Sequence, residues 1–415
     1  MNRWSFGDGR HDYLYGSPFS PLASIDYTKT SFFHHTIMLT LVSLLSLASV
    51  LSTSAVAKPC LVSDTGFNLY ALGFNGKDYN AGTMDSWSSG SPKDITASGR
   101  PPFDADNTMC FLSQFFNAVY VVNGDKSNPS DLYILNAGDG SWTKQSTNVG
   151  TFGIATSNMI LDHDTNLFYA VADDNTAWSL DMGSLTAADS ETKTWNELGN
   201  LGFTNLPSGY KSTMALAQNH IHFMGIEANS VDIFVIHFSY YQPETQTYGA
   251  DFPAEHGQAA SIFMPDGQGV QQQFAYIPDG GKNVYVLNVE SNTTTTLAGP
   301  SSQDADARYY ATSDALVQLA SDGSVNYIPV TGDNVASGSW SSVSALSSVA
   351  PTSSSGSSAS STGKGTNTAK GAAATHSGSS SSGSDNNEDG ARAQGVAFTG
   401  LIASVVLATF GLYAL

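Results

Sequence analysis

A repeat of about 50 residues is the feature that most constrains what this chain can fold into. The stretch NAVYVVNG, which starts at Asn117, returns 49 residues later as NLFYAVAD, so that Tyr169 takes the place of Tyr120. Fifty residues before Tyr120, the same frame contains Tyr70. Three consecutive matches on one frame indicate a repeat architecture rather than a chance likeness of two apolar strands.

Each unit contains four strand-like pieces that are separated by turn residues. In the second unit these pieces read MCFLS, NAVYVV, DLYILN and SWTKQS, and comparable sets follow in the later units. The last piece of each unit carries an aromatic residue or a Thr, namely Trp87, Trp142, Trp195, Tyr248, Thr296 and Trp340. Such units predict an all-β fold, a six-bladed β-propeller over residues 58–343, with a seven-bladed ring as the alternative. We expect early strands near Cys60 to pair with the last blade near Trp340 and so close the ring.

The overall composition narrows the choice of partners. Only 13% of the 415 residues are charged, and the formal net charge is −20. Low charge combined with abundant turn residues favours an all-β protein. The acidity argues against nucleic acid and anionic lipid as partners, because both require a basic surface. We therefore expect a monomeric head that binds a protein or a glycan.

The N-terminal residues predict entry into the secretory pathway. Residues 37–51 form an apolar run followed by small residues, which is the form of a signal cleaved after Ala57. Met38 is a natural start for such a signal. We therefore interpret residues 38–57 as a signal peptide and residues 1–37 as an unstructured upstream extension. A signal anchor is the alternative, although the run is short for a membrane span.

The C-terminal residues predict a stalk and a membrane anchor. Residues 344–395 are dominated by Ser, Gly and Thr and end in a polar spacer, which indicates a disordered stalk. Residues 396–415 are apolar and match a GPI-attachment signal, with a transmembrane tail as the alternative. Candidate attachment residues are Ser382, Gly383, Ser384, Asn386 and Gly390. Either anchor would hold the propeller at the extracellular face of the plasma membrane or in the cell wall.

The two cysteines, Cys60 and Cys110, would enter an oxidising compartment with this signal. We expect them to form a disulfide, because neither has another cysteine as partner, and two free thiols are the alternative. The closed loop of about 50 residues would stabilise the fold by about 4 kcal/mol in the chain-entropy model. Asn292 begins an Asn-Thr-Thr sequon, which predicts N-glycosylation of a surface loop.

The pattern of an apolar strand ending in Gly, an Asp-apolar-Tyr strand and a downstream Trp resembles kelch repeats. The best match is AVYVVNGDKSNPSDLYILNAGDGSWTK, and the resemblance covers about residues 60–343. The kelch double glycine survives at most as Gly280 and Gly281. The stalk and tail further resemble those of fungal cell-surface proteins in composition. This resemblance implies a kelch-like propeller as the ectodomain of a GPI-anchored protein.

Extracellular kelch-like propellers include copper radical oxidases similar to galactose oxidase. That family needs a Cys-Tyr crosslink, a second Tyr and two His as copper ligands. In this chain the cysteines are expected to bond to each other, and the nearest equivalent of the family's Tyr-His pair is Tyr309-Tyr310. The resemblance therefore implies the galactose-oxidase-like fold without its copper site.

Two groups of residues are weak metal candidates. His220 and His222 are two apart on an expected strand, so they share a face and could chelate a metal, while a solvent-facing strand is the alternative. Asp162, Asp164 and Asn166 have the alternate spacing of a calcium loop, although turn geometry alone favours the same residues. We assign no cofactor, and calcium remains the open possibility.

Acidic pairs recur just before first strands, and the chain has no short catalytic motif such as GxSxG, HExxH or a phosphate loop. The pairs are Asp104 with Asp106 and Asp304 with Asp306, which could bind calcium or form an acidic rim.

We predict a cell-surface recognition or adhesion module that binds a protein or glycan through propeller loops, without catalysis. The alternative is an extracellular hydrolase of carbohydrate or small esters, with acidic residues at the channel mouth. A third possibility is a structural wall protein whose stalk matters more than its head.

Overall fold

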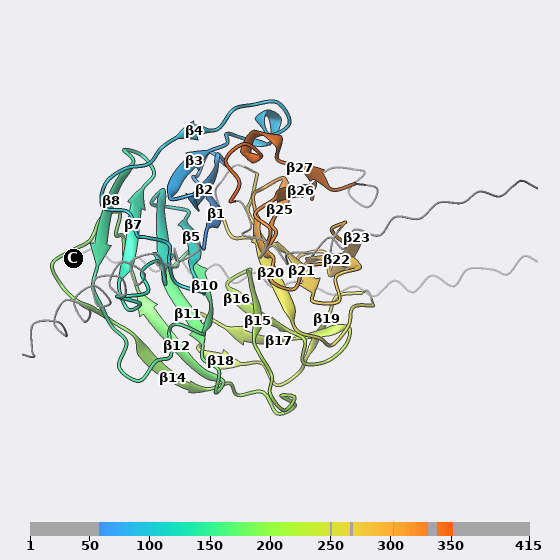
Figure 1. Ribbon diagram of the computed structural model, residues 1–415. Coiled ribbons are helices and arrows are strands. Elements are labelled where there is room, and N and C mark those ends of the chain that lie inside the picture. The colour runs from blue at the N-terminus through green and yellow to red at the C-terminus, as the bar shows by residue number, and fades with distance from the viewer. Residues whose placement is uncertain (1–57, 250, 266–268, 302, 331–337, 352–415) are drawn as a thin grey trace, which may run out of the picture. The chain divides into compact units, whose positions relative to one another are not determined.

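The computed structural model describes residues 58–249, 251–265, 269–301, 303–330 and 338–351. These residues form six antiparallel sheets arranged as blades around one axis, which is a six-bladed β-propeller (Figure 1). The predicted signal peptide, the cleavage point after Ala57, most of the stalk and the tail lie outside the described residues. Within the part of the chain that the structure describes, no helix has the length and apolarity needed to cross a membrane.

The strands follow one another blade by blade along the chain. Blade 1 contains β1 (Cys60–Ser63), β2 (Leu69–Phe74), β3 (Lys77–Asn80) and β4 (Lys93–Asp94). Blade 2 contains β5 (Met109–Ser113), β6 (Ala118–Val122), β7 (Leu132–Asn136) and β8 (Ser141–Gln145). Blade 3 contains β10 (Asn158–Asp162), β11 (Leu167–Val171), β12 (Thr176–Asp181) and β14 (Asn196–Asn200).

Blades 4 to 6 repeat this order with one irregularity. Blade 4 contains β15 (Thr213–Ala217), β16 (His220–Met224), β17 (Ser230–Val235), and a fourth strand in two pieces, β18 (Tyr240–Tyr241) and β19 (Gln246–Thr247). Blade 5 contains β20 (Gly257–Ile262), β21 (Gln273–Pro278), β22 (Asn283–Asn288) and β23 (Thr293–Ala298). Blade 6 contains β24 (Arg308–Ala311), β25 (Ala315–Leu319), β26 (Val325–Pro329) and β27 (Ser341–Ser342). A short parallel pair, β9 (Thr147–Asn148) and β13 (Lys193–Thr194), lies outside these sheets.

The recurrent Asn of the sequence repeat has a conformational explanation. Asn117 and Asn166 end the hairpins between the first and second strands of blades 2 and 3, with φ of 49° and 56°. Asn tolerates this left-handed conformation better than most residues, because its short amide can bond to nearby backbone. In blade 1 the same place is taken by Phe67, with φ of 57°. The repeat therefore marks a turn geometry as well as a strand.

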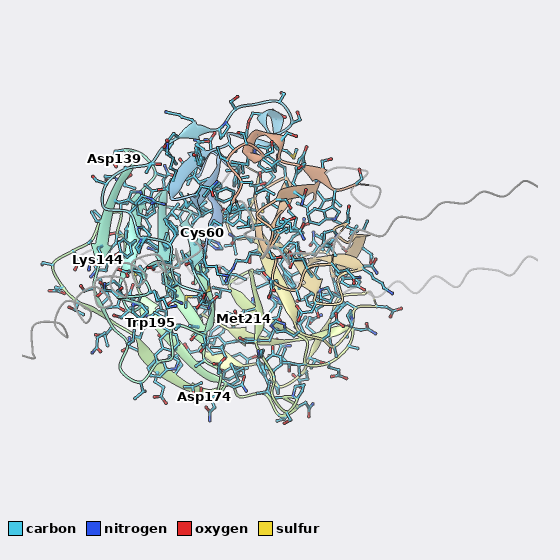
Figure 2. All side chains as sticks on the ribbon, in the orientation of Figure 1. Cys60, Asp139, Lys144, Asp174, Trp195 and Met214 are labelled. Carbon is cyan, nitrogen blue, oxygen red and sulfur yellow. A yellow bond between two sulfur atoms is a disulfide. The ribbon has the colours of Figure 1, made fainter. Side chains whose placement is uncertain are left out.

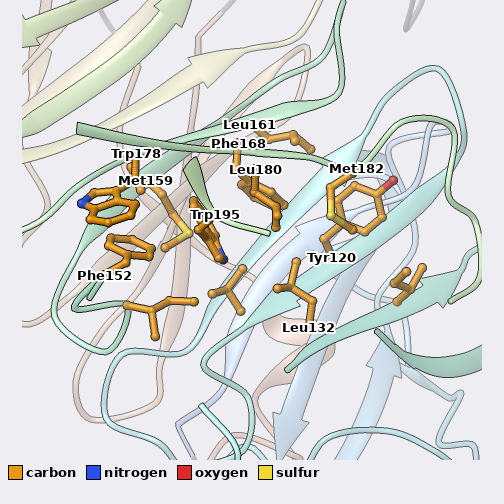
Figure 3. Close-up of a cluster of buried hydrophobic side chains, with 14 of the residues drawn as sticks. Tyr120, Leu132, Phe152, Met159, Leu161, Phe168, Trp178, Leu180, Met182 and Trp195 are labelled. Carbon is orange, nitrogen blue, oxygen red and sulfur yellow. The ribbon is translucent and has the colours of Figure 1, made fainter. Parts of the chain in front are cut away.

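Side chains pack between neighbouring blades, so most strands are buried on both faces. Figure 3 shows one such cluster, in which the ring of Tyr120 of blade 2 lies 5.9 Å from that of Phe168 of blade 3, and Phe168 in turn neighbours Trp195. The rings of Phe152 and Trp195 have centroids 4.7 Å apart. Each blade thus buries apolar surface that it could not bury alone, as in other repeat proteins.

The first blade departs from the predicted strand pattern. Trp87, expected in a last strand, follows the 3-10 helix η1 (Met84–Ser86) instead, and the fourth strand is β4. Trp87 is fully buried, donates from Nε1 to the Gly82 carbonyl at 2.8 Å, and meets Tyr327 of blade 6 edge-on at 5.0 Å. Packing between blades, rather than strand position, explains this Trp.

Ring closure also differs from the prediction, which was wrong in its hydrogen bonding. Among the described strands, β1 pairs with β2 and β27 pairs with β26, so no ladder crosses from blade 6 to blade 1. The 3-10 helix η3 (Ser344–Leu346) instead carries the chain over blade 1, where the Ala345 N–H donates to the Trp87 carbonyl at 3.0 Å. Closure therefore depends on this backbone hydrogen bond and on side-chain packing rather than on a shared strand ladder, because the strands of each blade pair with one another.

Candidate functional site

The inner strands of the six blades surround a central channel. Near one end the channel widens into a cavity of about 360 Å³, lined by the first residues of β1, β5, β10, β15, β20 and β24 and by residues just before them. Figure 2 shows Cys60 and Met214 near the axis, whereas Asp139, Lys144 and Asp174 lie at the periphery. We call this end of the channel the mouth.

A second cavity, of about 160 Å³, continues from the mouth along the axis. The two cavities share a wall, here called the waist, made of Cys110, Phe111, Met159, Met214, Ala259, Tyr309 and Tyr310. Most of the waist is apolar, and its two Met side chains are flexible enough to fit different shapes. Beyond it, leucines and Phe263 line the deep end together with His163 and Gln271.

Polar side chains at the mouth tie each blade to the next. Each donates a hydrogen bond to a backbone carbonyl at the start of the following inner strand. These bonds run from Asn107 Nδ2 to Ser157 at 3.1 Å, from Asn158 Nδ2 to Ser212 at 2.5 Å, from Thr213 Oγ1 to Gly257 at 3.0 Å, and from Gln258 Nε2 to Ala307. These four side chains form a girdle that fixes the mouth, so at least one donor of each is already used in the fold.

Arg308 completes the girdle but differs from its other members. Its Nη1 donates to the Thr108 carbonyl at 3.0 Å, and its Nη2 lies 3.3 Å from both the Asp106 carbonyl and Asn107 Oδ1. Arg308 in blade 6 thus bonds to residues that directly precede the first strand of blade 2, and these bonds bypass blade 1. No carboxylate of the described residues forms an ion pair with this guanidinium.

Arg308 carries a largely buried positive charge that has no carboxylate partner among the described residues of this acidic chain. Burial lowers the pKa of its guanidinium from the usual value, yet arginine stays protonated at neutral pH. Its positive charge at the mouth is therefore held only by neutral oxygen atoms. Asp306 and His256 also line the mouth, and the His256 Nδ1 lies 2.7 Å from Asp279 Oδ2.

The deep end of the channel contains buried polar atoms without hydrogen-bond partners. These atoms are both ring nitrogens of His163 and Oε1 of Gln271. Each residue is only 3% exposed. Burial lowers the pKa of His163 despite the nearby carboxylates of Asp164 and Asp162, so we describe its ring as neutral. A neutral ring offers one donor and one acceptor.

The predicted calcium loop folds as the hairpin between β10 and β11. Asn166 Oδ1 accepts from Ser113 at 2.8 Å, and its Nδ2 donates to Tyr120 and to the Gly183 carbonyl, which accounts for the amide completely. Asp162 is buried and accepts from Thr165, whereas Asp164 is partly exposed. No group of three or more His, Cys, Asp or Glu suited to a metal occurs among the described residues. The structure thus explains Asn166 as a turn residue.

The histidine pair occupies β16, but the solvent-facing alternative is wrong for His222. His222 is 2% exposed, its Nε2 lies 3.0 Å from the Tyr248 hydroxyl, and its ring lies 5.0 Å from that of Phe274 in blade 5. Both faces of a blade are covered by neighbours, so alternation along a strand does not expose one side. Burial lowers the pKa of His222 to about 3, while His220 remains half-buried.

Other predicted residues fall in different places. Cys60 and Cys110 form the expected disulfide, which joins the inner strands of blades 1 and 2 at the mouth. Asn292 is exposed in the turn before β23. Tyr310 shares a hydrogen bond with Ser63. The candidate attachment residues, Ser382 to Gly390, lie outside the described residues.

Sequence reasoning missed Arg308 and the girdle. A signal was present, because Asn158, Gln258 and Arg308 each stand directly before the frame position that corresponds to Cys60 and Cys110. Their side-chain types differ, however, so the similarity between repeats does not reveal them. The fold and this mouth define the protein as a six-bladed β-propeller with a ligand-sized axial channel.

Comparisons with known proteins add little to this definition. No protein-family model matches the sequence, and neither does any curated relative. Among solved structures, a chain in the crystal structure of a nidogen/laminin complex is similar, with 12% sequence identity and a TM-score of 0.40, over 65% of this chain and 89% of that one. The kelch and fungal resemblances have no support from these comparisons and stay hypotheses.

Proposed function

We propose that this protein is a recognition module that binds a protein or a glycan at the mouth of its propeller channel, without catalysis. The observation that carries the proposal is the state of the mouth side chains. Four polar side chains are engaged in the girdle, and the Arg308 guanidinium has no ionic partner among the described residues. An unpaired charge in a cavity of ligand size is typical of a binding site.

The hydrolase alternative has less support from the same geometry. Glycosidases use two carboxylates on opposite sides of the scissile bond, and Asp306 is the single carboxylate among the described residues that line the mouth. His256, the histidine at the mouth, pairs with Asp279. The waist and girdle therefore suit binding better than acid–base chemistry.

The proposal includes a location at the outer surface of the cell. The supports are sequence patterns alone, namely the signal-like residues 38–57 and the GPI-like residues 396–415. A phosphatidylinositol-specific phospholipase, applied to intact cells that express the full chain, is expected to release the protein. Retention of surface protein, while a control GPI-anchored protein is released, would contradict the anchor.

Blocking the mouth tests the proposed site. Ala305 is exposed and lines the mouth, so Ala305→Trp would cover the opening without disturbing the core. Ala187 is exposed in the loop after β12, so Ala187→Trp is the matched control. Labelled full-length protein would be applied to an array of oligosaccharides and to an array of peptides.

We expect wild-type protein and Ala187→Trp to bind the same array members, and Ala305→Trp to lose roughly tenfold or more in affinity, as expected when a central contact is blocked. Equal binding by all three proteins would refute the mouth as the site. Release of cleavage products by the wild-type protein would refute the non-catalytic role.

A further inference from the structure

We propose that the group entering the channel is a single carboxylate carried on an apolar body, with Arg308 binding the carboxylate and the waist enclosing the apolar part. This inference rests on the proposed function and names the chemistry of the ligand at that site. A polypeptide C-terminus with an apolar last residue and a free amphipathic acid share this chemistry.

The first step of the argument concerns the donors of Arg308. A guanidinium has five N–H donors in a planar fork that matches a carboxylate. The three contacts of Arg308 use its Nη1 and Nη2 atoms, and they leave the Nε–H and one Nη1–H without an acceptor in the described residues. These two donors point to different sides of the guanidinium, so each could donate one charge-assisted hydrogen bond to a carboxylate oxygen. The contacts to Thr108, Asp106 and Asn107 hold the guanidinium in place, so a carboxylate could accept a hydrogen bond from it without reorganising the side chain.

The second step concerns the charge around the mouth. Asp306 lines the opening, and Asp104 and Asp304 lie close by, where they accept backbone hydrogen bonds from Lys126 and Ser321. The whole chain carries a formal charge of −20. Repulsion from such a rim disfavours polyanions, whereas one carboxylate can be neutralised by Arg308. A monocarboxylate is therefore favoured over an acidic polymer.

The third step concerns the interior beyond Arg308. Phe111, Met159 and Met214 line both cavities, so a group that passes the mouth meets apolar walls. Burial of apolar ligand surface against these walls is favourable. The carboxylate thus fixes orientation, and the apolar body supplies area.

The fourth step is independent and sets the length of the apolar body. His163 and Gln271, each only 3% exposed, line the deep end of the second cavity, and the Nε2 of His163 lies 3.5 Å from Asp164 Oδ1. Methylene groups packed against these polar side chains gain less than methylene groups packed against the apolar waist, because polar groups without a hydrogen-bonding partner make a poor apolar wall. Affinity should therefore rise with chain length only until the apolar body reaches His163 and Gln271.

Isothermal titration of full-length protein tests the inference with defined probes. Octanoate and the peptide acetyl-Gly-Gly-Leu with a free C-terminus represent the two sources, and octanamide and the C-terminally amidated peptide are the neutral controls. We expect at least one acid to bind roughly 30-fold more tightly than its amide, as for a desolvated charge-assisted hydrogen bond. Equal affinity of acid and amide in both pairs would overturn the inference, whatever the variants do.

Charge-matched variants locate the contact. Arg308→Gln is expected to abolish the preference for the acid, whereas Lys126→Gln, which removes one positive charge at an exposed rim residue near Asp106, should preserve it. Arg308→Lys should retain part of the preference, because the charge stays but the planar guanidinium and its contacts to Thr108 and Asn107 are lost. A full preference in a folded Arg308→Gln protein would exclude Arg308 as the contact.

A homologous series of straight-chain acids from butanoate to hexadecanoate tests the deep end. We expect affinity to rise and then level off or fall, and His163→Leu should extend the rise to longer chains. A monotonic rise unaffected by His163→Leu would overturn the deep-end argument.

If Ala305→Trp blocks array ligands while acids and amides bind equally, the carboxylate inference fails and the proposed function stands. If octanoate binds Ala305→Trp as well as wild type, the mouth itself is refuted.

Discussion

The hydroxyl groups of Ser63 and Tyr310, 247 residues apart in the chain, lie 2.8 Å apart and join blade 1 to blade 6. Their hydrogen bond lies at the seam where the two ends of the repeat array meet. No strand of the described residues crosses this seam. Side chains such as Trp87, Tyr327 and Leu346 fill it instead. The seam is therefore the place where a single substitution should lower the stability of the closed ring most.

Replacement of Trp87 tests the packing of the seam. Trp87 is fully buried, so Trp87→Ala should lower the free energy of unfolding by about 3–5 kcal/mol through cavity formation. Trp340 is partly exposed at the edge of blade 6, so Trp340→Ala should cost below about 1 kcal/mol. Chemical denaturation of both variants checks this. Equal losses would show that the seam packing is not the stabilising feature.

Reduction of the disulfide tests the link between blades 1 and 2. The Cys60–Cys110 bond closes a loop with a sequence separation of 50, for which the chain-entropy model gives about 4 kcal/mol of stabilisation. The double variant Cys60→Ala, Cys110→Ala should unfold at a correspondingly lower denaturant concentration. Thiol titration of the unfolded wild-type protein should find no free thiol. Two free thiols would contradict the bond.

Buried His222 should make stability depend on pH. Its folded pKa, about 3, lies below the usual value of 6.5 because burial disfavours the charged ring. The unfolded chain therefore binds one more proton between these values, so stability is complete above about pH 6.5 and falls as the pH drops toward 3. The slope should approach about 1.4 kcal/mol per pH unit for this residue.

The His222→Gln variant should show a smaller difference in unfolding free energy between pH 7 and pH 5 than the wild-type protein. His237, which is exposed in the same blade, provides the control variant His237→Gln, with an unchanged difference. His163, whose pKa is also lowered by burial, should add to the wild-type slope. A pH dependence identical in all three proteins would contradict the burial argument.

A negative charge on the side chain at position 166 should destabilise the fold. Asn166→Asp would remove the amide donors to Tyr120 and Gly183 and bury a carboxylate, at a cost of about 2–4 kcal/mol. Asn175 has a similar φ of 63° but no side-chain hydrogen bond to the described residues, so Asn175→Asp should be nearly neutral. Thermal unfolding of the two variants separates the hydrogen-bonding role from turn geometry. Comparable losses in both would indicate that conformation alone matters.

The fold was predictable because the repeat reports local geometry that recurs in every blade. Residues 109–113 were expected as a strand, and β5 has these bounds. The hairpin Asn and the alternation of strand with turn are local features, so they are visible in the sequence. The confirmed disulfide also followed from a count of two cysteines.

The missed features depend on contacts between blades. Trp87 marks the seam rather than a strand, because its partner, Tyr327, is 240 residues away. His222 is buried because blade 5 covers its strand, which no pattern within blade 4 reveals. Arg308 similarly acquires its role from Thr108, 200 residues earlier. Such pairings become visible only when the ring is closed.

A crosslinking measurement tests the central claim, that the channel binds its ligand at the mouth and waist. Full-length protein would be irradiated with an octanoate analogue that carries a diazirine near its apolar end, and the labelled residues would be identified by mass spectrometry. We predict labels on Phe111, Met159 or Met214, reduced by excess octanoate and in Arg308→Gln. Labels spread over the outer strands, with no competition by octanoate, would contradict the account.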